Sequence, residues 1–374
     1  MLKRFSVTNF KNFKTKISLL LDQPCNYEFN EDIIKNDIIT KTIIYGINGS
    51  GKSNLALALF DIIFHLTDRE KTPSRYQLYR NLNSNKPTAD FEYLFTFNGV
   101  DVLYKYSKTD VTTLTHESLQ IDGQEVFDFD YKNNVGYTSL VGTENLNLTQ
   151  ISQNNPTFTS RLSRVKYIAN NALLVDNPIN NAFRDFVAFV DNMLMFYSLD
   201  TNGYQGLMVG GDSITQGIIR ENKVEDFQEF LAKQNIKYNL VVADYNGEKE
   251  LFCKFSRGTV PFMSVASTGT KSLALFYYWY IKMSYATLVC IDEYDAFYHF
   301  ELSQDLVKLV KTLPDTQIIM STQNTDLLSN DLLRPDAYFI LKENQIKSLN
   351  NLTDKDIRHA HNLQKMYKAG SFNE

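Results

Sequence analysis

Cysteine and long apolar runs are both scarce in this chain. Its 374 residues include three cysteines, Cys25, Cys253 and Cys290. They lie far apart, and two of them fall in apolar stretches typical of strands, which argues against disulfide bonds and against a zinc cluster. No apolar run reaches the roughly 18 to 20 residues that a membrane-spanning helix needs, and the opening residues, MLKRFSVTNF, lack the apolar centre of a signal peptide. We therefore expect a cytoplasmic protein that does not associate with a membrane.

An excess of positive charge is absent as well. The chain has 38 Lys and Arg residues against 43 Asp and Glu residues, which gives a net charge of −5 and an isoelectric point near 5.7. This balance argues against a surface that binds nucleic acid at every point, although a local basic face would still allow binding to DNA. Heptad repeats sustained over three or more heptads are also missing, so we expect no long coiled coil.

What is present is a mixture of strand and helix signals that predicts an α/β fold with a mixed central sheet. The first residues alternate apolar and polar side chains, which predicts an edge strand that turns at Asn9. Residues 40–45, TKTIIY, predict a buried strand, and the apolar spacing of residues 53–66 predicts a helix. Residues 90–131 contain short strands separated by Asn-Gly and Asp-Gly turns, as in an antiparallel β subdomain.

The later part of the chain adds a second set of elements. Two helical stretches, NAFRDFVAFVDNML and VEDFQEFLAKQ, predict a helical insert, and strand signals then return before an apolar helix and a further buried strand. We expect an N-terminal lobe with the β subdomain in residues 1–150, a helical insert or lid in residues 151–238, and a C-terminal lobe with a tail in residues 239–374.

The first motif that carries chemistry is the run GINGSGKS at residues 46–53, a complete phosphate-loop pattern. Backbone N–H groups at the start of a helix cradle phosphates, and glycine allows their close approach. Lys52 is expected to reach the β- and γ-phosphates of ATP, and the Ser53 hydroxyl to bind Mg²⁺. The predicted contacts with the nucleotide in this loop are Asn48, Gly49, Ser50, Gly51, Lys52 and Ser53.

The second motif is the apolar run LVCIDE at residues 288–293, which ends in two carboxylates. Asp292 is expected to bind Mg²⁺ directly or through water, and Glu293 to orient and deprotonate the attacking water. A buried strand that ends in an acidic turn is common in proteins, so this motif gains its meaning from the phosphate loop that precedes it.

The third motif is STGTKS at residues 267–272, followed at once by a helix. Its backbone N–H groups could form a second anion site. A Ser/Thr-rich helix N-cap explains the same residues equally well. The position of this loop about twenty residues before the acidic strand is what favours the first interpretation.

In this order the three motifs resemble those of the ATP-binding cassette (ABC) superfamily. The similarity is to its soluble SMC, RecF-like and OLD-like branch and to the related AAA-type ATPases of prokaryotic defence systems. The phosphate loop matches the GxNGSGKS form common in that branch, including Asn48 and Ser50. The opening FSVTNFKNF, the Ser-x-Gly loop STGT and the acidic DE-x-D end of the strand are further points of resemblance, which extends from the first strand to Thr325.

The resemblance implies a P-loop NTPase of the ABC type, with ATP and Mg²⁺ as cofactors and a site that one chain does not complete. Ser267, Gly269 and Thr270 of one copy would contact the ATP held by Lys52 of another, in a head-to-tail dimer or a higher oligomer. The loop that follows Glu293 would cross the dimer interface and couple the two sites. That loop contains Asp295, Ala296 and His299.

One position departs from the family pattern. After the strand QIIMS the family usually places a histidine that senses the γ-phosphate, and this chain has Gln323 there. Glutamine donates a hydrogen bond but carries no proton charge. We count Gln323 with Glu293 as the catalytic pair, and we expect hydrolysis to be slow.

The resulting hypothesis is an ATP hydrolase whose ATP-driven dimerisation controls a separate effector. That effector would be a nuclease or toxin of an anti-phage defence system, a role that rests on the family resemblance. An alternative is a RecF-like repair ATPase that clamps DNA. A third is the nucleotide-binding subunit of a membrane transporter, against which the NGSGKS context and the STGT loop argue.

Overall fold

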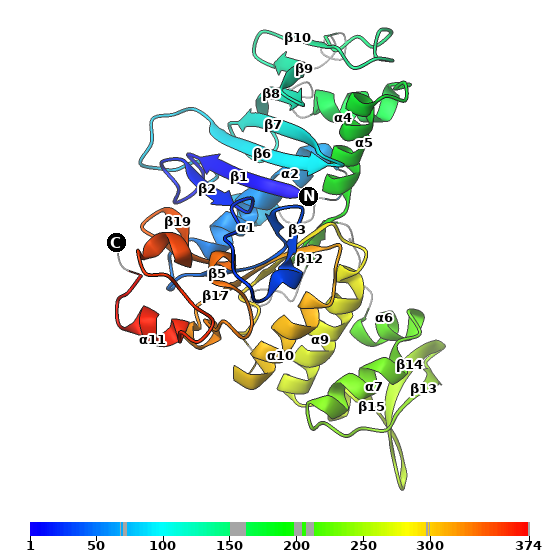
Figure 1. The fold of residues 1–374 in the computed structure, drawn as a ribbon. Coiled ribbons are helices and arrows are strands. Elements are labelled where there is room, and N and C mark those ends of the chain that lie inside the picture. The colour runs from blue at the N-terminus through cyan, green and yellow to red at the C-terminus, as the bar shows by residue number, and fades with distance from the viewer. Residues whose placement is uncertain are drawn as a thin grey trace.

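The computed structural model describes residues 1–67, 69, 73–149, 162–197, 204–206, 213–296, 298 and 300–372. Two seven-stranded sheets, called here the outer sheet and the central sheet, form the frame of the molecule. Helices lie between the two sheets and against the other face of the central sheet (Figure 1). None of the helices in these ranges combines the length and apolar character that crossing a membrane would require. The predicted α/β fold is confirmed, and the longest described helix has 16 residues.

The outer sheet is antiparallel throughout and has the order β10-β9-β8-β7-β6-β1-β2. Its strands are β1 Leu2–Thr8, β2 Ile17–Leu20, β6 Ala89–Phe97, β7 Val100–Lys108, β8 Leu114–Ile121, β9 Gln124–Asp130 and β10 Val135–Thr138. The predicted β subdomain corresponds to β6 to β9. The prediction that the first strand lies at an edge is wrong, because β1 pairs with both β6 and β2.

The central sheet has the order β12-β11-β16-β17-β5-β18-β19, in which the five inner strands are parallel. Its strands are β5 Lys41–Tyr45, β11 Met193–Tyr197, β12 Tyr204–Gly206, β16 Leu288–Asp292, β17 Gln317–Thr322, β18 Tyr338–Lys342 and β19 Gln345–Ser348. Two smaller sheets are built from β3 Ile34–Lys35 and β4 Ile38–Ile39, and from β13 Leu240–Tyr245, β14 Glu248–Phe255 and β15 Gly258–Pro261.

The helices are α1 Lys52–Phe60, α2 Ile62–Leu66, α4 Arg164–Asn171, α5 Pro178–Asp191, α6 Ile214–Arg220, α7 Val224–Lys233, α8 Phe262–Val265, α9 Thr268–Met283, α10 Phe300–Lys311 and α11 Leu363–Lys368. The range predicted as a helical insert contains α4 to α7, but it also supplies β11 to the central sheet. The sequence pattern predicted a helix that continues to Leu194, whereas α5 ends at Asp191 and an apolar strand begins two residues later. The boundaries of the three predicted parts remain a prediction.

Alternating side chains of the central strands separate two apolar cores. Cys290 and Ile319 face α1 and the outer sheet, whereas Val289 and Ile318 face α9 and α10. A buried side chain also fastens the two sheets to each other. Gln317 of β17 accepts a hydrogen bond from the Leu2 N–H at 2.6 Å and donates one to the Leu2 carbonyl at 2.9 Å. The first strand of the chain is therefore fixed to a strand beside the candidate site.

Candidate functional site

The phosphate loop connects β5 to α1 in a conformation that its glycines permit. Gly49 and Gly51 have φ angles of 79° and 104°, a region that residues with a Cβ rarely adopt. A side chain on Gly46 would clash with the Ser50 hydroxyl and would lie 2.9 Å from the Leu341 carbonyl. The first N–H groups of α1 have no acceptor within the helix, so they are available to an anion in this loop.

Lys52 is the buried cation of the loop, with 6% of its surface exposed. Its ammonium donates hydrogen bonds to the Gly46 carbonyl at 2.7 Å and to the Ile47 carbonyl at 3.3 Å. Burial lowers the pKa of Lys52, and nearby carboxylates, Glu293 foremost and then Asp292, oppose that shift. The loop thus holds a positive charge that faces the acidic end of a neighbouring strand.

That acidic end is organised by a serine from the next strand. Ser321 donates a hydrogen bond to Asp292 Oδ1 at 2.6 Å and accepts one from the Glu293 N–H at 2.8 Å. Glu293 has a φ of 48°, a conformation that costs a non-glycine residue on the order of 1 kcal/mol. Burial and the charge of Asp292 raise the pKa of Glu293, while Lys52 opposes the rise. Ser321 therefore fixes the Asp292 carboxylate and the backbone of Glu293 at the same point.

Three parallel strands bring these groups together. The order β16-β17-β5 places the carboxyl ends of the strands side by side, and the Gly46 N–H donates to the Thr322 carbonyl at 3.3 Å. Gln323 follows directly and is exposed at the end of β17. Asp295 lies at the same edge, where burial raises the pKa of its carboxyl and hydrogen bonds from Thr322 and Asn324 oppose that shift.

Two residues of the site, Asn12 and Ser321, lie outside the three motifs. Asn12 follows the first strand, a position from which either a nucleotide contact or a solvated turn can be expected. Asn12 donates to Asn344 Oδ1 at 3.0 Å and accepts from Asn54 Nδ2 at 2.7 Å. A Cβ on Gly51 would lie 2.5 Å from the Asn12 amide nitrogen, so this amide packs directly against the phosphate loop. The sequence did not predict the role of Ser321. The apolar strand at residues 317–322 ends in hydroxyl residues, and this pattern is the signal that could have indicated that role.

The STGT loop lies at the start of α9, away from these groups. Ser267 caps the helix, since its hydroxyl accepts from the Thr270 N–H at 3.2 Å and lies 2.9 Å from the Thr270 hydroxyl. Ser267 and Gly269 are exposed, and a Cβ on Gly269 would contact only the Ser267 hydroxyl, at 4.0 Å. Within the described ranges, no hydrogen bond or ion pair joins this loop to the phosphate loop of the same chain.

The residues at the sheet edge fit a magnesium nucleotide. Ser50 Oγ is buried beside Gly46 and has no hydrogen-bond partner among the described residues, so the phosphate loop contains an unsatisfied polar group. In the same ranges no group of three or more His, Cys, Asp or Glu side chains could hold a metal by itself. Magnesium bound to ATP needs only one or two protein oxygens, with phosphates and water completing its shell, and the exposed Ser53 and half-buried Asp292 supply that number. Their roles as ligands stay a prediction.

Residues 160–329 match the family model described as AAA domain, putative AbiEii toxin, Type IV TA system. No curated protein matches the chain. Similar solved structures include the SMC head domain from Thermotoga maritima, with 15% identity, a TM-score of 0.45 and coverage of 93% of this chain and 99% of that one. An SMC head bound to the C-winged helix domain of ScpA has 13% identity, a TM-score of 0.46 and coverage of 93% and 97%. An SMC head with an extended coiled coil, bound to the C-terminal domain of ScpA derived from Pyrococcus furiosus, has 13% identity, a TM-score of 0.43 and coverage of 94% and 97%.

A glycine-rich loop between a parallel strand and a helix, an acidic strand end two places away in the same sheet, and the match of residues 160–329 to an AAA domain support a P-loop ATPase. The matched segment, residues 160–329, is similar to the AAA domains of that family. This match agrees with the resemblance to AAA-type ATPases of prokaryotic defence systems that the motifs indicated.

Proposed function

We propose that the protein is a Mg²⁺-dependent ATP hydrolase that closes head to tail with a second copy of itself and acts as a switch for a separate effector. The observation that carries this proposal is the separation of two anion-binding loops. The phosphate loop faces its own acidic strand end, whereas the STGT loop is capped, exposed and open at Gly269. A partner copy would bring the missing loop to each site.

In this mechanism the residues of the chain bind the phosphates and orient the attacking water. Lys52 and the first turn of α1 hold the β- and γ-phosphates, and Glu293 accepts a proton from the attacking water. Magnesium, held by Ser53 and Asp292, neutralises charge on the phosphates. Ser321 orients the Asp292 carboxylate, which would serve the metal, and anchors the backbone of Glu293, whose carboxylate would serve the water.

The effector is proposed to be a nuclease or toxin in a defence system against phage. The family description names a putative toxin of a Type IV toxin–antitoxin system, which supports such a setting. Among the residues that the structure describes, no cluster of three or more His, Cys, Asp or Glu side chains has the arrangement that a metal-dependent nuclease uses. The cutting or toxic activity is therefore assigned to a different protein.

The test combines two variants and a control. Glu293→Gln should bind ATP without hydrolysing it, so light scattering should detect a mass of two chains when ATP and Mg²⁺ are present. Gly269→Glu should bind ATP as a monomer but neither dimerise nor hydrolyse, because the site has room for a side chain in one chain and none in a closed dimer. Thr259→Glu, on exposed β15, is the matched control and should behave like the wild type.

Hydrolysis by Gly269→Glu at the wild-type rate would contradict the shared site. The effector proposal is tested separately, by isolating the protein from its host and measuring the activity of whatever copurifies with and without ATP. ATP-dependent binding to DNA with a steep salt dependence, in the absence of any effector, would instead support the DNA clamp.

A further inference from the structure

The helix that begins at the phosphate loop is interrupted at one buried acidic residue. The structure ends α1 at Phe60 and begins α2 at Ile62, with Asp61 between them. The Asp61 side chain is 0% exposed, as is that of its ion-pair partner, Lys108 of β7. A buried charge is costly unless it is paired and hydrogen-bonded, so this position calls for a physical explanation.

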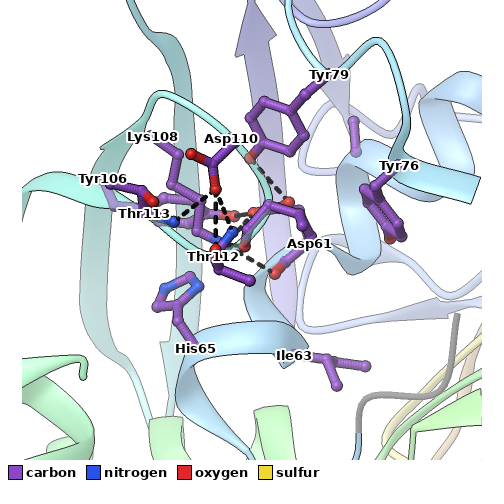
Figure 2. A network of polar contacts seen from close by, with 12 residues as sticks. Asp61, Ile63, His65, Tyr76, Tyr79, Tyr106, Lys108, Asp110, Thr112 and Thr113 are labelled. Carbon is purple, nitrogen blue, oxygen red and sulfur yellow. Dashed lines mark hydrogen bonds and ion pairs between the residues drawn. The ribbon is translucent and has the colours of Figure 1, made fainter. Parts of the chain in front are cut away.

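The Asp61 carboxylate receives three donors, all from the outer sheet or the segment that leads into it (Figure 2). Lys108 donates at 2.7 Å, the Tyr79 hydroxyl at 2.8 Å and the Tyr106 hydroxyl at 3.0 Å. Burial raises the pKa of the Asp61 carboxyl and lowers that of the Lys108 ammonium, and in each case the attraction between the two groups opposes the shift. Because all three partners donate, the acceptor they fit is an ionised carboxylate.

The backbone of α1 is held from the same side. The Tyr76 hydroxyl donates to the Leu57 carbonyl at 2.9 Å. The Tyr93 hydroxyl, from β6, lies 3.0 Å from the Ala58 carbonyl and 3.1 Å from the Leu59 carbonyl. The last carbonyls of a helix lack their usual partners within it, and here tyrosine hydroxyls contact them; the Ala58 carbonyl also accepts from the Asp61 N–H at 3.2 Å.

We propose that the outer sheet positions the phosphate-loop helix through Asp61, Lys108 and these tyrosine hydroxyls, and that nucleotide affinity is therefore set from the outer sheet. The proposal rests on the ATP binding proposed above. Asp61 is nine helical residues from Lys52, about 13 Å at 1.5 Å per residue, so it acts as a positioning residue and does not contact the nucleotide. Its partners fix the far end of the helix, and the near end presents its N–H groups to the phosphates.

Coupling of this kind is reciprocal. If the outer sheet favours the binding-competent position of α1, then bound nucleotide stabilises the contacts of α1 with the outer sheet by the same free energy. Groups that act on the water and the metal, namely Asp292, Glu293 and Ser321, belong to β16 and β17 and are not fastened by this network. The network should therefore affect ATP binding more than turnover at saturating ATP.

The first test removes hydroxyl groups without changing the shape of the core. The double variant Tyr76→Phe/Tyr93→Phe should raise the Kd for ATP roughly 5- to 10-fold, with kcat unchanged, since coupling energies of this kind lie at the low end of the usual range. Tyr131→Phe is the matched control, because its buried hydroxyl bonds Glu117 and the Leu162 carbonyl and touches neither α1 nor α2 through that group. Urea denaturation of all variants measures the loss of stability that is common to them.

An equal Kd for the double variant and the control would overturn the proposal while leaving ATP binding by the wild type intact. Failure of the wild type itself to bind ATP would overturn the proposed function instead, so the two failures are distinguishable. A rise in Kd shared by the control would show a purely structural effect and would also overturn the proposal.

The second test uses hydrogen exchange on the wild-type protein. Addition of ATP and Mg²⁺ should slow exchange of amides in β6 and β7, which lie on the far side of α1 from the central sheet. The sheet of β13 to β15 serves as the internal reference, because it packs against α6, α7 and α8 instead. Protection in β6 and β7 no greater than in β13 to β15 would contradict the coupling.

The variant Asp61→Asn/Lys108→Met, which removes both charges together, should fold but lose this protection. Full protection in that variant would equally contradict it.

Discussion

The helices α1 and α9 both begin at a loop that is expected to contact ATP, yet the molecule holds them in different ways. Hydroxyl groups and a buried ion pair fasten α1 at its carboxyl end. Around α9 aromatic packing is prominent, with Trp279 stacked on Phe196 of β11 at 4.4 Å between ring centroids. Its polar contacts include a hydrogen bond from the Tyr298 hydroxyl to the Ser272 carbonyl and the partly exposed ion pair of Lys282 with Glu221. Hydrogen bonds are directional and fix one position, whereas apolar contacts tolerate small displacements. The difference is therefore one of burial, because the ion pair that holds α1 is wholly buried and that of α9 is partly exposed.

The largest effect is expected from breaking the polar attachment of α1. Lys108→Met leaves the Asp61 carboxylate buried without its cation, and we expect the free energy of unfolding to fall by about 3–5 kcal/mol. Lys105→Met, on the exposed face of the same strand, is the control and should change it by less than about 0.5 kcal/mol. Urea denaturation measures both. Similar values for the two variants would remove the distinction between the buried network and ordinary surface charge.

The next prediction compares substitutions in the first turn of α1 and in the first turn of α9. Lys52→Ala should weaken ATP binding at least about 100-fold, roughly 3 kcal/mol, because the charged contact with the β- and γ-phosphates is lost. Lys271→Ala, in the exposed first turn of α9, should leave the ATP affinity of the monomer unchanged. Titration with a fluorescent ATP analogue would measure both. Retention of wild-type affinity by Lys52→Ala would refute the assignment of the phosphate loop.

A smaller effect is expected in the apolar attachment of α9. Trp279→Phe should lower the free energy of unfolding by about 1–2 kcal/mol, since the aromatic contact is partly kept. The same variant should bind ATP as the wild type does, because no hydrogen bond or ion pair among the described residues joins α9 to the phosphate loop of the same chain. A marked loss of ATP affinity would show that α1 and α9 are coupled within one chain and would contradict their separate attachment.

The smallest effect concerns Gln323. Histidine at this position could carry a proton charge toward the γ-phosphate, so Gln323→His should raise ATP turnover by a few fold, less than the tenfold that corresponds to about 1.4 kcal/mol. Gln345→His, in the exposed hairpin of β18 and β19, is the control. Steady-state hydrolysis assays would decide. An unchanged rate would mean that the residue type at 323 does not limit turnover.

The sequence was most informative where chemistry is local. The strand, loop and helix around Lys52 and the acidic end at Asp292 follow from contiguous residues, and the structure places them as neighbours at one sheet edge. The position of β1 and the strand β11 could not be derived in the same way, because strand order depends on pairings between distant segments. The ion pair of Asp61 with Lys108 was invisible for the same reason. Each of these residues looks like an ordinary surface charge until the fold brings them together.

The strand order of the central sheet also determines when the site can exist during synthesis. The strand that leads into the phosphate loop, β5, pairs only with β17 and β18, which follow it at a distance of roughly 270 residues. At about 5–20 residues per second, a ribosome needs roughly a quarter of a minute to a minute to reach them. Until then β5 has no neighbours in its sheet, and the carboxylates at Asp292 and Glu293 are made only shortly before β17. A chain that was cut short in the middle would carry the complete phosphate-loop sequence and still be unable to use ATP.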